Sequence, residues 1–199
     1  MGATGRAPSR VMIVRHGEKP RRKGHAPFGV DASGGHDFES LSVGGWQRAG
    51  ALAALFAPAR GRLQDPNLAR PDLIYAAAPS RRGGADGSQS QRPLQTITPL
   101  AARLGLAPNL DYTKGDESAL VQDVLAQSGN VLISWQHKAI PAMAKLIVAS
   151  APRPPSIPLS WPEDRYDLVW VLTAPAAAGR WSFSQVPQLL LAGDRVADA

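Results

Sequence analysis

Four consecutive apolar residues, Val-Met-Ile-Val at positions 11–14, constrain the fold of this chain more than any other stretch of its sequence. A short run of apolar, mostly β-branched residues is typical of a strand that is buried on both faces. Arg15 and His16 follow the run at once, and Gly17 comes next, a residue that can take unusual backbone angles. Because ligands of open α/β sheets bind outside the carboxyl ends of strands, we expect Arg15 and His16 to face a ligand.

The rest of the chain alternates between apolar runs and segments of helical periodicity. Strands are predicted over residues 73–77, 131–134 and 166–172, with an edge strand over 180–186 for which an antiparallel orientation is one option. Helices are predicted over residues 43–56, 92–104, 117–125 and 141–148. Such alternation indicates an α/β fold with a mostly parallel sheet between two layers of helices, a three-layer α/β/α arrangement.

The length and composition of the chain set limits on its class. A chain of 199 residues is expected to form a single domain over residues 1–199. No apolar run is long enough for a membrane span or a signal peptide, so we expect a cytoplasmic protein that does not bind membranes. The absence of cysteine excludes disulfides and thiolate metal sites.

The chain is basic, with a formal net charge of +6, which raises the question of nucleic-acid binding. Five basic residues lie within positions 15–23, against the single acid Glu18. Beside a phosphate pocket, such a basic segment would steer anionic substrates; alternatively, it is a solvated loop. No zinc-finger, recognition-helix or interleaved aromatic and basic pattern is present, and we predict no nucleic-acid partner.

Arg92 and His137 are two further candidates for binding phosphate, beside Arg15 and His16. Arg92 opens a predicted helix, and helix N-termini favour phosphate because their free N–H groups and the helix dipole point there. His137 comes shortly after the predicted strand at 131–134. Alone, each has a simple structural explanation, as a surface arginine and a structural histidine. Together with a strand that ends in Arg15 and His16, they predict a phosphate site.

Four stretches in order resemble the histidine phosphatase superfamily, which has the phosphoglycerate-mutase-like fold. They are the Arg-His-Gly tripeptide at 15–17 and the segments at 41–48, 92–96 and 131–137. The first resembles the family's signature after its first strand, and the second resembles the entry to its first helix. The third and fourth resemble the segments that carry its second arginine and its second histidine. Four segments in the right order are far more specific than one tripeptide.

The resemblance implies a metal-independent phosphatase that needs no cofactor and works through a phosphohistidine intermediate. It implies that His16 is the nucleophile and that Arg15, Arg92 and His137 bind the phosphoryl group, with Gly17 allowing a close approach. The expected substrate is a phosphorylated small molecule or a phosphoprotein. From the residues alone, neutral imidazole is a competent nucleophile near pH 7, and fixed arginines can neutralise a transferring phosphoryl group.

One departure from the family pattern concerns a serine. In the family, a serine directly follows the second strand and stands four residues before the second arginine. Here Ser80 ends the apolar run, whereas Ser88 has the required spacing from Arg92, and residues 81–87 resemble an insertion. The spacing assigns Ser88 to substrate binding, with Ser80 as the alternative.

The general acid is a second departure. In one branch of the family it is a glutamate between the second arginine and the second histidine, and in another it follows the second histidine, where this chain has Lys138. We predict Glu117 as the acid, then Asp116, with Glu18 as an outside candidate. Capping of the helix at 117–125 explains Asp116 and Glu117 equally well.

A different class of function fits the same residues. A catalytically weak or silent module that binds phosphoryl ligands would keep the arginines and need no acid. Turnover of a generic aryl phosphate distinguishes this module from a phosphatase.

His25 and His36 are interpreted as exposed loop histidines, since no second ligand falls at metal spacing, and we predict no metal site.

Overall fold

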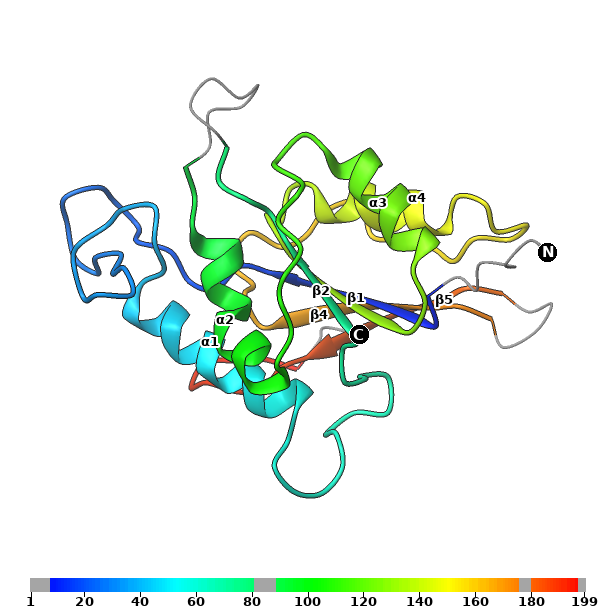
Figure 1. The fold of residues 1–199 in the computed structure, drawn as a ribbon, viewed down its shortest axis with the longest axis horizontal. Coiled ribbons are helices and arrows are strands. Elements are labelled where there is room, and N and C mark those ends of the chain that lie inside the picture. Colours follow the sequence, from blue (N-terminus) through cyan, green and yellow to red (C-terminus); the bar gives the residue numbers. More distant parts are fainter. Residues whose placement is uncertain (1–7, 81–88, 176–179, 197–199) are drawn as a thin grey trace.

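The computed structural model describes residues 8–80, 89–175 and 180–196. These residues form a five-stranded sheet with helices on both faces (Figure 1). The spatial order of the strands is β2-β3-β1-β4-β5. Their bounds are β1 (Arg10–Arg15), β2 (Leu73–Ala76), β3 (Asn130–Trp135), β4 (Leu168–Thr173) and β5 (Ser182–Pro187).

The central strand β1 is buried on both faces, as its apolar run predicts. Met12 and Val14 pack in one core with helices α1 (Val43–Phe56) and α2 (Arg92–Leu104). Val11 and Ile13 pack in the other core with α3 (Glu117–Ala126) and α4 (Ile140–Val148). Because successive side chains of a strand point to opposite faces, β1 joins the two cores. Two layers of helices therefore enclose the sheet, as expected.

The prediction of a mostly parallel sheet is wrong. Strands β2, β3 and β1 are parallel, but β4 pairs antiparallel with β1 and β5 pairs antiparallel with β4, so the sheet is mixed. The cause lies in residues 149–167, which connect α4 to β4, are rich in proline and contain no helix. This segment returns to the edge where β1 ends, so that Val14 pairs with Val169 and β4 runs back across the sheet. The edge strand expected near 180–186 is present as β5, in the antiparallel orientation.

Two predicted helix boundaries are confirmed by their local contacts. Ser42 is the N-cap of α1, and its side chain accepts a hydrogen bond from the backbone N–H of Gly45. Helix α2 begins at Arg92 and ends at Gly105, which has a φ of 68° in the left-handed region that glycine tolerates. No helix among the described residues is long and apolar enough to cross a membrane.

The parallel strands β2, β3 and β1 end at the same edge of the sheet. The backbone N–H of His16, just after β1, donates to the carbonyl of Trp135 at the end of β3 over 3.0 Å. The N–H of Ala77, just after β2, donates to the carbonyl of Ser134 over 3.2 Å. These bonds extend the sheet by one residue and bring the segments that follow the three strands together.

Candidate active site

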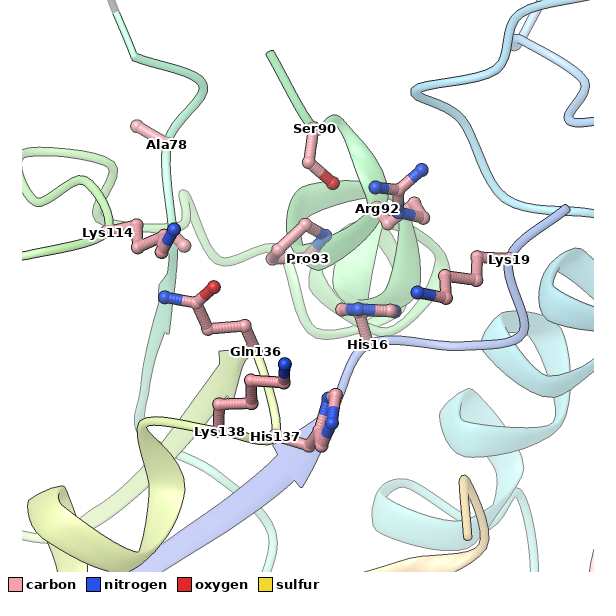
Figure 2. A pocket seen from close by; sticks show the side chains of 11 residues that line it. His16, Lys19, Ala78, Ser90, Arg92, Pro93, Lys114, Gln136, His137 and Lys138 are labelled. Atoms are coloured by element: carbon pink, nitrogen blue, oxygen red, sulfur yellow. The ribbon is translucent and has the colours of Figure 1, made fainter. Parts of the chain in front are cut away.

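A pocket of about 210 Å³ lies at this edge of the sheet. The segments after β1, β2 and β3 and the start of α2 form its walls (Figure 2). The charged and titratable side chains that line it are His16, Lys19, Arg92, Lys114, His137 and Lys138. None of the described residues that line it is an aspartate or a glutamate. The pocket therefore attracts anions.

His16 is held in one tautomer by its neighbour. Its side chain is only 7% exposed, and its Nδ1 lies 2.8 Å from the backbone carbonyl oxygen of Gly17. Because a carbonyl oxygen can only accept a hydrogen bond, Nδ1 carries the proton. In the neutral ring Nε2 then keeps its lone pair, which is the electronic requirement for a nucleophile.

The surroundings of His16 keep its ring neutral. Burial lowers the pKa of His16 from 6.5 to about 3, and the positive charges of Arg92, Arg15 and Lys19 act in the same direction. At neutral pH the imidazole is therefore uncharged and its Nε2 lone pair is available.

His137 lines the pocket from the segment after β3 and lies close to His16 (Figure 2). Burial lowers the pKa of His137 to about 4, with contributions from the charges of Arg15 and Lys19. Its Nε2 is buried and has no hydrogen-bond partner among the described residues. The same is true of Nε of Arg92 and Oγ of Ser90, which also line the pocket. Each of these three groups can donate to an oxygen of a bound anion.

The two histidines make the stability of the fold depend on pH. Their folded pKa values of about 3 and about 4 lie below the 6.5 of an exposed histidine, so the unfolded chain binds more protons between these limits. We expect the free energy of unfolding to fall as the pH decreases from 6.5 towards 4. Denaturant titrations at a series of pH values measure this fall. In His16→Gln the free energy of unfolding should decrease less steeply with falling pH than in the wild type, and in the exposed His25→Gln it should decrease as in the wild type. Parallel curves for wild type and His16→Gln would contradict this prediction.

Arg15 is 2% exposed and lies behind the pocket, since it is not among the residues that line it. One terminal nitrogen, Nη1, donates to the carbonyls of Glu163 (2.6 Å) and Arg165 (3.0 Å). Its Cζ lies 3.8 Å from the centroid of the Tyr166 ring, a cation–π contact. These contacts fix the guanidinium beside both histidines, whose pKa values its charge lowers.

Arg92 lines the pocket from the first turn of α2, the position that the sequence predicts. Its Nη1 donates to the carbonyl of Phe38 over 2.8 Å, and its Nη2 lies 3.4 Å from the carboxylate of Glu39. Burial lowers the pKa of Arg92, but a guanidinium remains charged at any pH at which the protein is folded. The planar group thus ties the loop before α1 to the pocket.

Gly17 has a clear packing reason to be glycine. A Cβ at this position would come within 3.0 Å of the Gly45 carbonyl oxygen and 3.1 Å of its Cα, at the start of α1. The N–H of Gly17 donates to Oγ1 of Thr96 in α2 over 2.8 Å. The residue after His16 is thereby fixed against both helices of one layer. A close approach of substrate at Gly17 stays a prediction.

The predicted serine cannot be placed, because Ser88 lies outside the described residues. Ser80, the alternative, is buried and does not line the pocket. Ser90 lines it instead. The family spacing of four residues before Arg92 does not select Ser90, which is only two residues away, and sequence reasoning missed it.

The predicted acids lie away from the pocket. Oε1 of Glu117 accepts from Nε1 of Trp135 (2.9 Å) and Nε2 of Gln136 (3.5 Å), and its Oε2 accepts from the N–H of Gly115 (3.1 Å). Glu117 therefore does not line the pocket itself, but it contacts Gln136, which does. The carboxylate of Asp116 accepts from the backbone N–H and the hydroxyl of Thr113.

Glu18 points to the opposite side of its loop. Its Oε1 accepts from Nε (2.9 Å) and Nη2 (2.7 Å) of Arg48, whose pKa these bonds raise against the effect of burial. Asp194 completes the cluster by binding both terminal nitrogens of Arg48. This is a structural ion pair, and it explains why Glu18 does not line the pocket.

Lysines add to the positive charge of the pocket. Lys19 belongs to the basic segment at 15–23, for which the sequence analysis considers a place beside a phosphate pocket. Sequence reasoning missed Lys138 as a pocket residue, although its position directly after His137 is a signal that could have found it. Lys114 comes from the loop before α3, far from any motif, and has no such signal. Within the described residues, no three His, Asp or Glu side chains are grouped as metal ligands. Metal independence stays a prediction.

Comparisons with known proteins assign no family to this chain. No protein-family model matches the chain, and no curated protein sequence matches it. Among solved structures, the chain is similar to the candidate phosphohistidine phosphatase SixA from Agrobacterium tumefaciens, with 20% sequence identity and a TM-score of 0.42. The similarity covers 89% of this chain and 97% of that one. A likeness at this level is weak and assigns no activity.

Proposed function

We propose that the protein is a metal-independent phosphoester hydrolase that forms a phosphohistidine on His16. The observation that carries this proposal is the Nδ1 contact with the Gly17 carbonyl, which leaves the Nε2 lone pair in a pocket lined by cations. A neutral, oriented imidazole beside fixed positive charges is what nucleophilic attack on a phosphoryl group requires.

In the first step, the Nε2 lone pair of His16 attacks phosphorus. The bond from phosphorus to the leaving oxygen breaks, and its electron pair stays on that oxygen, so that the leaving group departs as an oxyanion. Negative charge on the equatorial oxygens is stabilised by Arg92 and His137 in the pocket and by Arg15 behind it. In the second step, water attacks phosphorus and the N–P bond breaks. Its electron pair returns to Nε2, and phosphate and a proton leave to solvent. Phosphorylated small molecules and phosphoproteins both fit this chemistry.

A rapidly quenched reaction tests the proposal. The wild-type protein is mixed with nitrophenyl phosphate in EDTA and quenched in alkali, since phosphoramidates are labile in acid. Peptide mapping should then place one phosphate on His16, and steady-state release of phosphate should continue in the chelator. The proposal is wrong if phosphate release persists in His16→Ala or if turnover needs an added divalent metal.

A second candidate function is a silent module that binds phosphoryl ligands. It is favoured by the pocket lining, in which none of the described residues is a carboxylic acid that could protonate a leaving group. Inorganic phosphate would bind such a module with an affinity that falls as Arg92 is removed, and no substrate would turn over. Calorimetric binding combined with a panel of phosphoesters separates the two functions.

The role of Glu117 is testable through the leaving group. Nitrophenolate leaves without a proton, whereas an alkyl alkoxide needs one, so loss of a general acid harms only the alkyl phosphate. Because Glu117 binds Trp135 and Gln136 instead of lining the pocket, we expect Glu117→Gln to slow both substrates by the same factor, below about fivefold. A loss of a hundredfold confined to the alkyl phosphate would restore Glu117 as the acid. The same pattern in Asp116→Asn would move the assignment to that residue.

A further inference from the structure

A second pocket of about 260 Å³ lies within the loop that joins β1 to α1. Three aromatic rings (Phe28, His36 and Phe38) and two basic side chains (Arg22 and Lys23) are among its lining residues. We call it the aromatic–basic pocket. Phe28 is 38% exposed and Phe38 is 37% exposed. Two phenylalanines in contact with water, rimmed by cations, are typical of a binding surface.

Two links connect the aromatic–basic pocket to the pocket around His16. Lys19 lines the His16 pocket and Pro20, the next residue, lines the aromatic–basic pocket. Arg92 lines the His16 pocket while its Nη1 donates to the carbonyl of Phe38, which lines the other. A molecule whose phosphoryl group is bound at His16 and Arg92 would therefore have the aromatic–basic pocket beside it.

The aromatic–basic pocket is held in shape by contacts inside its own loop. The rings of Phe28 and His36 are stacked, with centroids 4.2 Å apart and planes at 16°. The N–H of Asp37 donates to the carbonyl of Gly29 over 2.9 Å, and Nε1 of Trp46 in α1 donates to the carbonyl of Val30 over 2.8 Å. A Cβ at Gly29 would collide with the Asp37 carbonyl oxygen, so the two sides of the loop are in direct contact.

The lining of the pocket favours the aromatic part of a molecule that carries negative charge. Asp37 is the single acid among its described lining residues, and its carboxylate already accepts from the N–H of Glu39 and the hydroxyl of Ser40. Arg22 and Lys23 are the cations that line this pocket, and Lys19 lines the neighbouring His16 pocket. Phenylalanine rings favour a planar aromatic partner because offset or edge-to-face ring pairs add to the burial of apolar area.

We propose that the aromatic–basic pocket binds the leaving-group part of a small phosphate ester that carries a planar aromatic ring, as a nucleotide or an aryl phosphate does. The proposal rests on the proposed function, because the phosphoryl group of the same molecule is placed at His16. It narrows the substrate from phosphoesters in general to aromatic ones, and it assigns Phe28 and Phe38 to specificity instead of chemistry.

Two substrates distinguish specificity from chemistry. 1-Naphthyl phosphate carries an aromatic ring for the aromatic–basic pocket as well as a phosphoryl group for the His16 pocket, whereas acetyl phosphate carries no ring. We expect Phe28→Ala and Phe38→Ala to lower kcat/KM for 1-naphthyl phosphate by about tenfold, with acetyl phosphate unchanged. Leu159→Ala is the matched control, because Leu159 is 85% exposed and lines neither pocket. Equal losses on both substrates, or no loss on either, overturn the proposal.

The experiment also separates this proposal from the proposed function. If the wild-type protein turns over neither substrate, the phosphatase proposal fails. Calorimetry of ligand binding then still tests whether the aromatic–basic pocket binds an aromatic ring. In that case, 1-naphthyl phosphate should bind the wild type more tightly than inorganic phosphate does, and Phe28→Ala should remove the difference. A phosphopeptide whose turnover depends on Phe28 while that of 1-naphthyl phosphate does not would overturn the small-molecule assignment.

Discussion

The His16→Ala variant is expected to lose turnover of nitrophenyl phosphate by at least about a thousandfold, the scale seen when a nucleophile is removed from an enzyme. The reason is the covalent step: the Nε2 lone pair, kept free by the Nδ1 contact with Gly17, has no replacement in alanine. Binding of inorganic phosphate should persist, since Arg92, Lys19 and Lys138 still line the pocket. Phosphate release and calorimetric phosphate binding measure the two effects.

His25→Ala is the matched control for this variant. His25 is exposed in the loop at 18–40 and lines neither the His16 pocket nor the aromatic–basic pocket, so its removal should leave the rate within about twofold. Circular dichroism of both variants confirms that each is folded. If His16→Ala keeps more than a tenth of the wild-type rate, His16 is not the nucleophile.

The sequence predicts the meeting of His16, Arg92 and His137 because their positions are set by the regular part of the fold. His16 follows a strand with a clear apolar run, and Arg92 is the first residue of a helix that is capped by Gly105. Parallel strands bring their carboxyl ends to one edge, so residues that are distant in sequence meet there. All three residues indeed line one pocket.

The contacts that hold Arg15 could not be predicted. Its partners, the carbonyls of Glu163 and Arg165 and the ring of Tyr166, are about 150 residues away. Glu163 and Arg165 belong to a segment with no helical or strand periodicity, and Tyr166 is the first residue of the strand predicted over 166–172. Backbone carbonyls carry no sequence signal, and the path of a proline-rich connection depends on the packing of the whole domain. The direction of β4 was mispredicted for the same reason.

The acid candidates show a second limit of the sequence. A carboxylate between two motifs suggests a proton donor, but its partners decide its role. Glu18 is bound by Arg48 of α1, which does not line the pocket, and Glu117 is bound by the indole of Trp135. Neither pairing follows from spacing along the chain, because each joins residues that only the packed fold brings together.

Arg92→Lys should lower kcat/KM for aryl phosphates by between about tenfold and a hundredfold, or roughly 1.4 to 2.7 kcal/mol of transition-state binding. The guanidinium has three nitrogens with separate tasks: Nη1 binds the Phe38 carbonyl, Nη2 faces Glu39, and Nε is buried at the pocket without a partner among the described residues. A lysine ammonium keeps the charge, but it lacks the planar guanidinium that can bind the Phe38 carbonyl and a phosphoryl oxygen through separate nitrogens at the same time.

The matched control is Arg103→Lys, because Arg103 is exposed in the last turn of the same helix. It should leave both the rate and the thermal midpoint within error of the wild type. Since Arg92 is proposed to stabilise charge that develops on the phosphoryl oxygens, the loss in Arg92→Lys should appear in kcat as well as in KM. A loss confined to KM would mean that Arg92 binds substrate and transition state equally. A rate equal to that of Arg103→Lys would mean that Arg92 only ties the Phe38 loop to helix α2.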